Sequence, residues 1–160
     1  MAKTAAKGAT TGATKSARRT SRWAVDDYLS YLLSQASHVV ASKFHEEVRA
    51  AGLTILEWRV LATLSDGRSR SVGDIAYIAL AQQSTVTKLL GRLEADGRVE
   101  RSEGEVDRRQ SLVSITPAGR TALGTLLTKS KQHERGLVAR LNQREAASLK
   151  SALRKLMAED

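Results

Sequence analysis

The sequence predicts a mostly α-helical chain with one small β-hairpin, an α+β arrangement. Over most of the chain the apolar residues recur every three or four positions, as they do in helices with one buried face. Between residues 98 and 116 the period falls to two, which is typical of strands. Two short helices joined by a tight turn precede this hairpin. The order predicts a winged helix-turn-helix unit, with one long helix before it and further helices after it.

Length and composition limit the classes of protein to which the chain can belong. A chain of 160 residues with 41% hydrophobic content can bury one core. No apolar run approaches the roughly 18–20 residues of a membrane span, and no apolar segment typical of a secretory signal follows the basic N-terminus. Cysteine is absent, which excludes disulfides, thiolate metal sites and cysteine redox switches. We therefore expect no membrane partner and no cofactor.

The formal net charge of +9 points to a polyanionic partner, but its distribution is uneven. Residues 1–22 carry six basic residues, no acidic residue and no large apolar residue after Met1. Such a segment buries too little surface to offset its ordering entropy, so we expect a disordered basic tail. It could follow DNA phosphates. A solubilising leader fits equally well, and an organellar transit peptide fits the composition but lacks an apolar face.

A long helical pattern runs from Trp23 to Ala51, and Gly52 ends it. Its apolar positions are too numerous for one narrow stripe, which indicates packing against more than its own domain. A partner subunit is the simplest explanation, so residues 23–52 are predicted to form a dimerisation helix.

Residues 53–116 are predicted to form the winged helix-turn-helix lobe. Its first helix, Thr54 to Leu64, has a capping box made by Thr54 and Glu57. A short helix starts at Ser71. The next helix spans 82–97, where Val86, Leu89, Leu90 and Leu93 recur at helical spacing.

The other face of the 82–97 helix is short, polar and cationic, as suits a helix in a DNA major groove. Gln can bond to base edges, Ser and Thr to bases or phosphates, and Lys and Arg to phosphates or guanine. An ordinary amphipathic surface helix would show the same pattern. The candidate DNA contacts on this helix are Gln82, Gln83, Ser84, Thr85, Thr87, Lys88 and Arg92.

Two strands, 98–102 and 111–116, are joined by a polar loop and predict the wing. Val113 and Ile115 should face one side of the hairpin. Arg108 and Arg109 lie near the tip, where an arginine can enter the minor groove, and Asp107 could orient Arg109. A solvated hairpin turn is the alternative.

The segment 82–110 is not net basic, because it holds six basic and six acidic residues. A DNA-binding surface therefore requires the two kinds of charge to be segregated. Lys88, Arg92, Arg108 and Arg109 should share a face, and the residues that should turn away are Glu94, Asp96, Glu100 and Glu103.

Residues 117–160 are predicted to be helical and to take part in dimerisation. Thr116-Pro117 opens a helix that is expected to run to about Ala139, with threonine as the N-cap. A final helix starts at Asn142, which forms a capping pair with Glu145. Neither helix has a large enough partner within a lobe of this size.

The order of elements and three local sequences resemble the MarR family of bacterial transcriptional regulators. These sequences are LEWRVLATL, QQSTVTKLLGRLEADGRVER and DRRQSLVSITPAGR. The resemblance covers about residues 23–157, and the Asp-x-Arg of the wing with the S-I-T-P-A-G that follows is its most specific part.

The resemblance implies a cytoplasmic, nucleoid-associated homodimer that represses genes from palindromic operators. It also implies that a small molecule bound between the DNA-binding lobe and the dimerisation helices releases the DNA. Phenolic or aromatic carboxylates and their coenzyme A thioesters are typical ligands. Gln83, Ser84, Thr85, Thr87 and Lys88 would then meet the major groove, while Arg109, held by Asp107, would enter the minor groove.

An aromatic slot with a cationic or imidazole group would suit such a ligand. The candidates are Tyr28, Tyr31, His38, Trp58 and Arg59. Each could instead be an ordinary core, interface or surface residue. A basic cluster on the C-terminal helices could hold a coenzyme A phosphate or be a solvated face; it comprises Lys129, Lys131, Arg135, Arg140 and Arg144.

His38 and His45 share a helix face, but two histidines are weak evidence for a metal, because zinc sites want three or four ligands. Nothing in the sequence supports an enzyme: it has no cysteine nucleophile and no glycine-rich phosphate loop. Two other functions stay open, a nonspecific nucleoid-like DNA binder and a winged-helix protein-interaction module.

Overall fold

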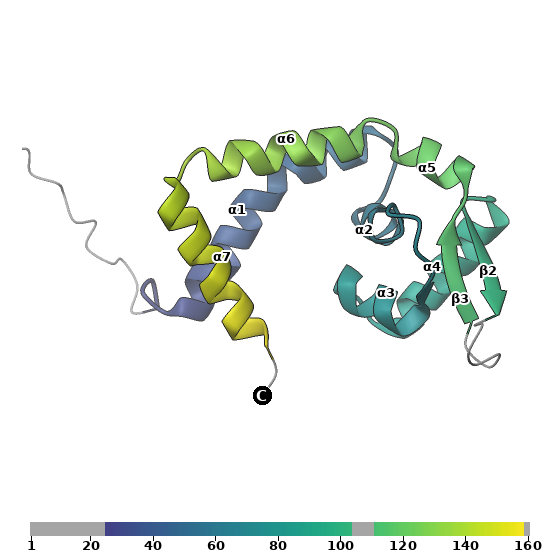
Figure 1. The fold of residues 1–160 in the computed structure, drawn as a ribbon, viewed down its shortest axis with the longest axis horizontal. Coiled ribbons are helices and arrows are strands. Elements are labelled where there is room, and N and C mark those ends of the chain that lie inside the picture. Colours follow the sequence, from purple (N-terminus) through teal and green to yellow (C-terminus); the bar gives the residue numbers. More distant parts are fainter. Residues whose placement is uncertain (1–24, 104–110, 159–160) are drawn as a thin grey trace, which may run out of the picture. The chain divides into compact units, whose positions relative to one another are not determined.

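The computed structural model describes residues 25–103 and 111–158 (Figure 1). The chain divides into two compact units, residues 1–37 and residues 38–160. In the described ranges no helix is long and apolar enough to cross a membrane. The elements are α1 (Leu29–Ala50), α2 (Ile55–Thr63), β1 (Arg70–Ser71), α3 (Val72–Ala79), α4 (Gln83–Ala95), β2 (Val99–Glu103), β3 (Ser111–Ile115), α5 (Pro117–Leu123), α6 (Leu126–Val138) and α7 (Gln143–Met157).

The first unit contains the start of α1, which begins at Leu29 rather than at Trp23 as the sequence predicted. The Tyr28 N–H donates to the Val25 carbonyl at 2.9 Å and closes a turn before the helix. Two aspartates occupy this turn, and short carboxylate side chains favour turns because they compete with the backbone for hydrogen bonds. Trp23 itself lies outside the described residues.

The core of the second unit is built by α2, α3 and α4, with the small sheet beside them. Helix α2 has the predicted capping box: the Glu57 N–H donates to the Thr54 hydroxyl, and the Thr54 N–H donates to the Glu57 carboxylate at 2.7 Å. The completely buried side chains of the three helices include Val60, Leu61, Ile75, Val86, Leu90 and Leu93, and Leu64, the C-cap of α2, is buried with them. The predicted helix-turn-helix is therefore present, with its apolar faces turned inward.

The sheet has three strands in the order β1-β3-β2, and both pairings are antiparallel. Val113 and Ile115 are buried, as the sequence predicted, and Ser111 is exposed on the same strand. Strand β1 was not predicted, because two residues are too few to show a period of two. It pairs Arg70 with Val113 and Ser71 with Leu112.

The predicted single helix from Pro117 to Ala139 is wrong, since it is two helices, α5 and α6. Gly124 separates them with φ 47° and ψ −127°, a combination that residues with a Cβ rarely adopt. Leu123 and Leu126 on either side of the break are both buried in the core. The glycine at position 124 is the one feature of the sequence that could have predicted this break between α5 and α6.

The start of α5 is held against the start of β2 by unusually close backbone packing. The Thr116 N–H donates to the Arg98 carbonyl at 3.1 Å, and the Thr116 hydroxyl lies 2.7 Å from the Gly97 carbonyl. A Cβ on Gly119 would lie 2.1 Å from the Arg98 carbonyl oxygen. Residue 119 must therefore be glycine for α5 to lie this close to the wing.

We expect Gly119→Ala to destabilise the protein by about 3 kcal/mol, because the new methyl group must displace backbone atoms. In a domain of this size that corresponds to a melting temperature lower by about 6–12 °C at equal protein concentration. The matched control is Gly91→Ala, because nothing lies within 4 Å of the added Cβ. It should stabilise α4 by up to about 1 kcal/mol. Equal melting temperatures for the two variants would contradict the packing described.

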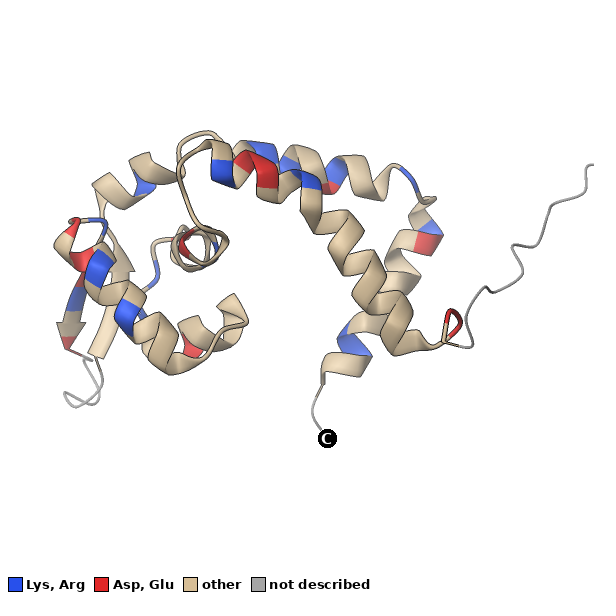
Figure 2. Cartoon of the chain, turned by 180° about the vertical axis from the view of Figure 1, so that it is seen from behind, with Lys and Arg blue, Asp and Glu red and all other residues tan. Residues whose placement is uncertain are grey.

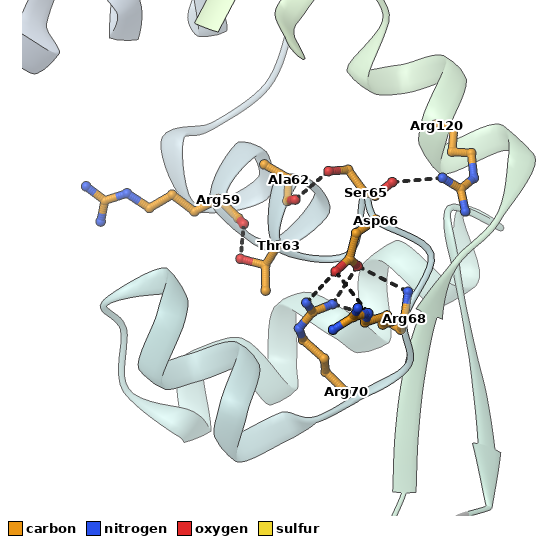
Figure 3. A network of polar contacts seen from close by, with 8 residues as sticks. All are labelled: Arg59, Ala62, Thr63, Ser65, Asp66, Arg68, Arg70 and Arg120. Carbon is orange, nitrogen blue, oxygen red and sulfur yellow. Dashed lines mark hydrogen bonds and ion pairs between the residues drawn. The ribbon is translucent and has the colours of Figure 1, made fainter. Parts of the chain in front are cut away.

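A polar network fixes the loop between α2 and β1 (Figure 3). Arg70 donates to both carboxylate oxygens of Asp66, at 2.8 and 2.7 Å, and the Arg68 N–H donates to the same carboxylate at 3.1 Å. Arg120 of α5 donates to the Ser65 carbonyl at 2.9 Å. The hydrogen bonds from Arg70 and Arg68 hold the pKa of Asp66 well below its usual range. The loop thus joins α2 to both the sheet and α5.

The lowered pKa of Asp66 predicts a pH-dependent contribution to stability. The contribution is complete above the unfolded pKa of about 3.9 and is lost as the pH falls from there toward the lower folded pKa. Asp66→Asn should therefore lower the melting temperature at neutral pH, and the difference from the wild type should shrink below about pH 4. In an Arg70→Met background, Asp66→Asn should have a smaller effect at neutral pH. A difference that stays constant down to about pH 2.5 would disprove the assignment.

Candidate nucleic-acid interface

Helix α4 presents a continuous polar face to solvent. Its four apolar residues, Val86, Leu89, Leu90 and Leu93, are at most 1% exposed. All the candidate DNA contacts of this helix are exposed: Gln82, Gln83, Ser84, Thr85, Thr87, Lys88 and Arg92. The hydroxyl of Thr87 donates to the Gln83 carbonyl at 2.8 Å, so toward a ligand it is left with an acceptor. The face therefore offers amide, hydroxyl and cationic groups together.

The beginning of α4 lacks the side-chain cap found on neighbouring helices. Helices α2, α3 and α5 begin with Thr54, Ser71 and Thr116, whose hydroxyls accept a first-turn N–H. Gln82, the N-cap of α4, makes no such bond. Backbone N–H groups at an uncapped helix start are suited to bind a phosphate oxygen, since the helix dipole favours negative charge there.

The acidic residues that follow on the chain are engaged by neighbours. Glu94 accepts from Arg101 of β2 at 3.0 Å, and Asp96 lies 3.9 Å from Arg98. Glu100 accepts a hydrogen bond from Ser114 at 3.1 Å. These contacts partly neutralise the acidic side chains near the basic residues of α4. Figure 2 shows the basic residues along this helix in blue.

Lys88 and Arg92 occupy successive turns of α4, while Glu94 comes two positions after Arg92. Two positions correspond to about 200° around an α-helix, so Glu94 lies near the opposite margin of the polar face. Both basic residues are exposed, and within the described ranges neither has an ion-pair partner shorter than 4.0 Å. The cations are thus available to a polyanion.

The wing is formed by β2 and β3, whose pairing continues to Glu103 opposite Ser111. Its predicted functional residues, Asp107, Arg108 and Arg109, lie outside the described residues. The same is true of the basic tail, residues 1–22.

The predicted ligand residues have different environments. Trp58 is 9% exposed, and its ring meets that of Phe44 edge-on with centroids 5.1 Å apart. Arg59 donates to the Ala79 carbonyl at 3.3 Å. Trp58 therefore contributes to the core, and Arg59 ties α2 to the end of α3. Both also remain candidates for contacts with a ligand. Tyr28 and Tyr31 belong to the other unit of the chain.

His38 and His45, the histidines that the sequence places on one face of α1, differ in exposure, and His45 is half-buried. Burial lowers the pKa of His45, and the charges of Arg59, Arg49 and His38 lower it further. His38 is exposed. In the described part of the chain no three histidine, aspartate or glutamate residues are grouped as a metal would require.

Known proteins with similar sequences are transcriptional regulators, which agrees with the exposed polar and basic face of α4. The sequence model of the MarR family matches residues 51–110. Two curated relatives are the transcriptional activatory protein BadR of Rhodopseudomonas palustris and the homoprotocatechuate degradative operon repressor of Escherichia coli. BadR is 37% identical over 58% of this chain and 54% of its own length, so the match spans about half of BadR. The repressor is 28% identical over 82% of this chain and 89% of its own length.

Solved structures extend the similarity to most of the chain. A MarR family regulator from Silicibacter pomeroyi DSS-3, SPO1453, is 35% identical, with a TM-score of 0.73 over 83% of this chain and 95% of that one. BpsR of Bordetella bronchiseptica, whose DNA binding is regulated by 6-hydroxynicotinic acid, is 26% identical, with a TM-score of 0.72 over 86% and 99%. The relatives regulate transcription, in agreement with the prediction that the chain is not an enzyme. With its winged helix-turn-helix and these matches, the chain belongs to the MarR family of transcriptional regulators.

Proposed function

We propose that the chain is a ligand-responsive repressor that binds a palindromic DNA operator as a homodimer. The observation that carries this proposal is the exposed face of α4, which has amide, hydroxyl and basic groups over a fully buried apolar face. Side chains of these types read base edges and neutralise phosphates. BadR is named as an activatory protein and the E. coli relative as a repressor; we propose repression because the E. coli relative matches over more of the chain.

Exposed apolar residues on α7 support the homodimer. Leu149, Leu156 and Met157 are 49%, 59% and 66% exposed, and they recur at helical spacing. Val39 of α1 is 61% exposed. Exposed apolar residues that recur along one helix are characteristic of association sites. In the proposed dimer two α4 helices would lie about 34 Å apart, or a multiple of that distance, to reach successive major grooves of a palindrome.

The effector that we propose is a small aromatic acid or its coenzyme A thioester, which lowers operator affinity. Relatives support the aromatic class: one represses a homoprotocatechuate degradative operon, and DNA binding by BpsR is regulated by 6-hydroxynicotinic acid. A ligand that prefers a different spacing of the two α4 helices would shift the population away from the DNA-binding form. Such coupling is typically about 1–3 kcal/mol, or about 5–150-fold in affinity. The contacts proposed from the sequence are Tyr28, Tyr31, His38, Trp58 and Arg59.

Lys88→Ala tests α4 as the DNA-binding helix. If Lys88 contacts a phosphate, its loss should weaken binding of operator and unrelated DNA alike and reduce the slope of log K against log[salt] by about 1. Fluorescence anisotropy over a salt series measures both quantities. Lys131→Ala on α6 is the matched control and should change neither. An unchanged salt slope for Lys88→Ala would refute the phosphate contact.

Arg109→Ala tests the proposed minor-groove contact of the wing. The side chain would lie where the potential of the minor groove is most negative, so its loss should weaken operator binding by at least about tenfold. Sedimentation analysis should show the same dimer as the wild type. Unchanged operator affinity in this variant would show that the wing does not contact DNA as proposed.

Removal of residues 1–22 separates the repressor from the two other functions. A repressor shortened in this way should keep its preference for one palindrome, while a nucleoid-like binder driven by the basic tail should lose DNA affinity altogether. A protein-interaction module would show no salt-dependent DNA binding by residues 23–160. The comparison needs only a selected operator and a scrambled duplex of equal length.

A further inference from the structure

The exposed face of α4 consists of two neighbouring ridges with different chemistry. Residues four positions apart lie nearly above one another on an α-helix, so each ridge takes every fourth residue. One ridge is neutral and is formed by Gln83, Thr87 and Gly91, all of which are exposed. The other ridge carries the exposed cations Lys88 and Arg92. Cations suit phosphates, so the neutral ridge is the one better suited to base edges.

Thr87, in the middle of the neutral ridge, has a restricted capacity for hydrogen bonds. A free hydroxyl has one donor and two acceptor positions, and it can turn to satisfy either kind of partner. The Thr87 hydroxyl donates to the Gln83 carbonyl at 2.8 Å, so its hydrogen is directed back along the helix. A ligand in front of α4 therefore meets oxygen lone pairs. A ligand that needed the hydrogen would first have to break this bond, which weakens its binding by about three- to tenfold.

The bases differ in what they offer to such an oxygen. In the major groove, adenine presents an amino group at N6 and cytosine presents one at N4, and both are donors. Guanine and thymine present only acceptors there. An oxygen that can only accept therefore distinguishes adenine from guanine, and cytosine from thymine. The amide of Gln83 both donates and accepts, so it has no such restriction.

Gly91 lies one turn beyond Thr87, and the packing of the free protein does not require a glycine there. Nothing lies within 4 Å of a Cβ built on it. A glycine inside an α-helix lowers the stability of the helix relative to alanine. The position therefore has a cost that no contact in the described part of the chain explains. A bare position beside a short side chain allows a base pair to come close to the Thr87 hydroxyl.

We propose that Thr87 accepts a hydrogen bond from the exocyclic amino group of an adenine or cytosine in the operator, and that Gly91 allows the close approach that this contact needs. Thr87 thus selects amino bases over keto bases at one position of each half-site. The inference rests on the proposed operator binding, and it adds the kind of base that α4 reads at that position.

Base analogues that lack only the amino group test this contact. The full-length chain first selects an operator from random duplexes. Each adenine of a half-site is then replaced in turn by purine, and each cytosine by 2-pyrimidinone, and fluorescence anisotropy measures binding. At one position the wild type should lose about three- to tenfold in affinity. Any effect of the analogue on the duplex itself is common to all variants of the protein.

Two substitutions of Thr87 separate the hydroxyl from the shape of the side chain. Thr87→Val has nearly the same shape but no acceptor, so the analogue at that position should weaken its binding no further. Thr87→Ser keeps the hydroxyl and should respond to the analogue as the wild type does. The proposal is overturned if Thr87→Val responds to every analogue as the wild type does. It is also overturned if the base whose preference Thr87→Val loses is guanine or thymine.

The matched control is Thr121→Val on α5. The Thr121 hydroxyl donates to the Pro117 carbonyl at 3.0 Å, four positions back, as the Thr87 hydroxyl does to Gln83. The substitution therefore removes the same kind of bond from an exposed threonine of another helix. This variant should respond to every analogue as the wild type does, and a response like that of Thr87→Val would contradict a direct contact.

Gly91→Ala tests the close approach. The added methyl group meets no atom of the free protein within 4 Å, so the melting temperature should not fall. Operator affinity should fall by about fivefold or more, because the methyl group would displace the DNA. A loss of binding without a loss of stability cannot come from misfolding. Unchanged operator affinity would overturn the role proposed for Gly91.

The outcomes separate this inference from the repressor proposal. A chain that selects no operator refutes both. A chain that selects an operator, and whose Thr87→Val variant keeps every base preference, refutes the reading by Thr87 and leaves the repressor in place.

Discussion

The contact between the first turn of α5 and the Gly97–Arg98 backbone joins the main parts of the DNA-binding lobe. Thr116 bonds to both carbonyls of that backbone, and Gly119 allows an approach that any side chain would prevent. Because Gly97 and Arg98 connect α4 to β2, this contact fixes α4, the wing and α5 relative to one another. Arg120, one residue further, ties the same helix to the end of α2 through the Ser65 carbonyl.

The exposed cations on the proposed DNA-binding face of α4 result from local pairing of the acidic residues rather than from an excess of basic residues. The segment 82–110 has as many acidic as basic side chains. Arg101 holds Glu94, while Lys88 and Arg92 stay exposed on α4. Burial works to raise the pKa of Glu57, but hydrogen bonds from Thr54 and the charges of Arg92 and Arg98 outweigh it and lower that pKa. Glu57 therefore stays ionised beside α4, and Lys88 and Arg92 remain exposed at the surface of that helix.

Elements with strong local signals could be predicted from the sequence, and those set by distant contacts could not. The capping residues Thr54, Ser71, Thr116 and Asn142 all begin helices where predicted, since a cap depends only on residues three positions apart. Strand β1 depends on pairing with β3, more than forty residues later along the chain, and leaves no pattern of its own. The break at Gly124 was missed because the apolar spacing continues across it.

The glycine between α5 and α6 has a mechanical consequence. Without the break, residues 117–138 would form one straight helix, and α6 would have to follow the axis of α5. With Gly124 at φ 47° and ψ −127°, the chain instead changes direction at one residue, and the hydrogen bonds inside α5 and α6 stay separate on either side of it. The direction of α6 is thus set at a single glycine, which two buried leucines, Leu123 and Leu126, anchor to the core on either side.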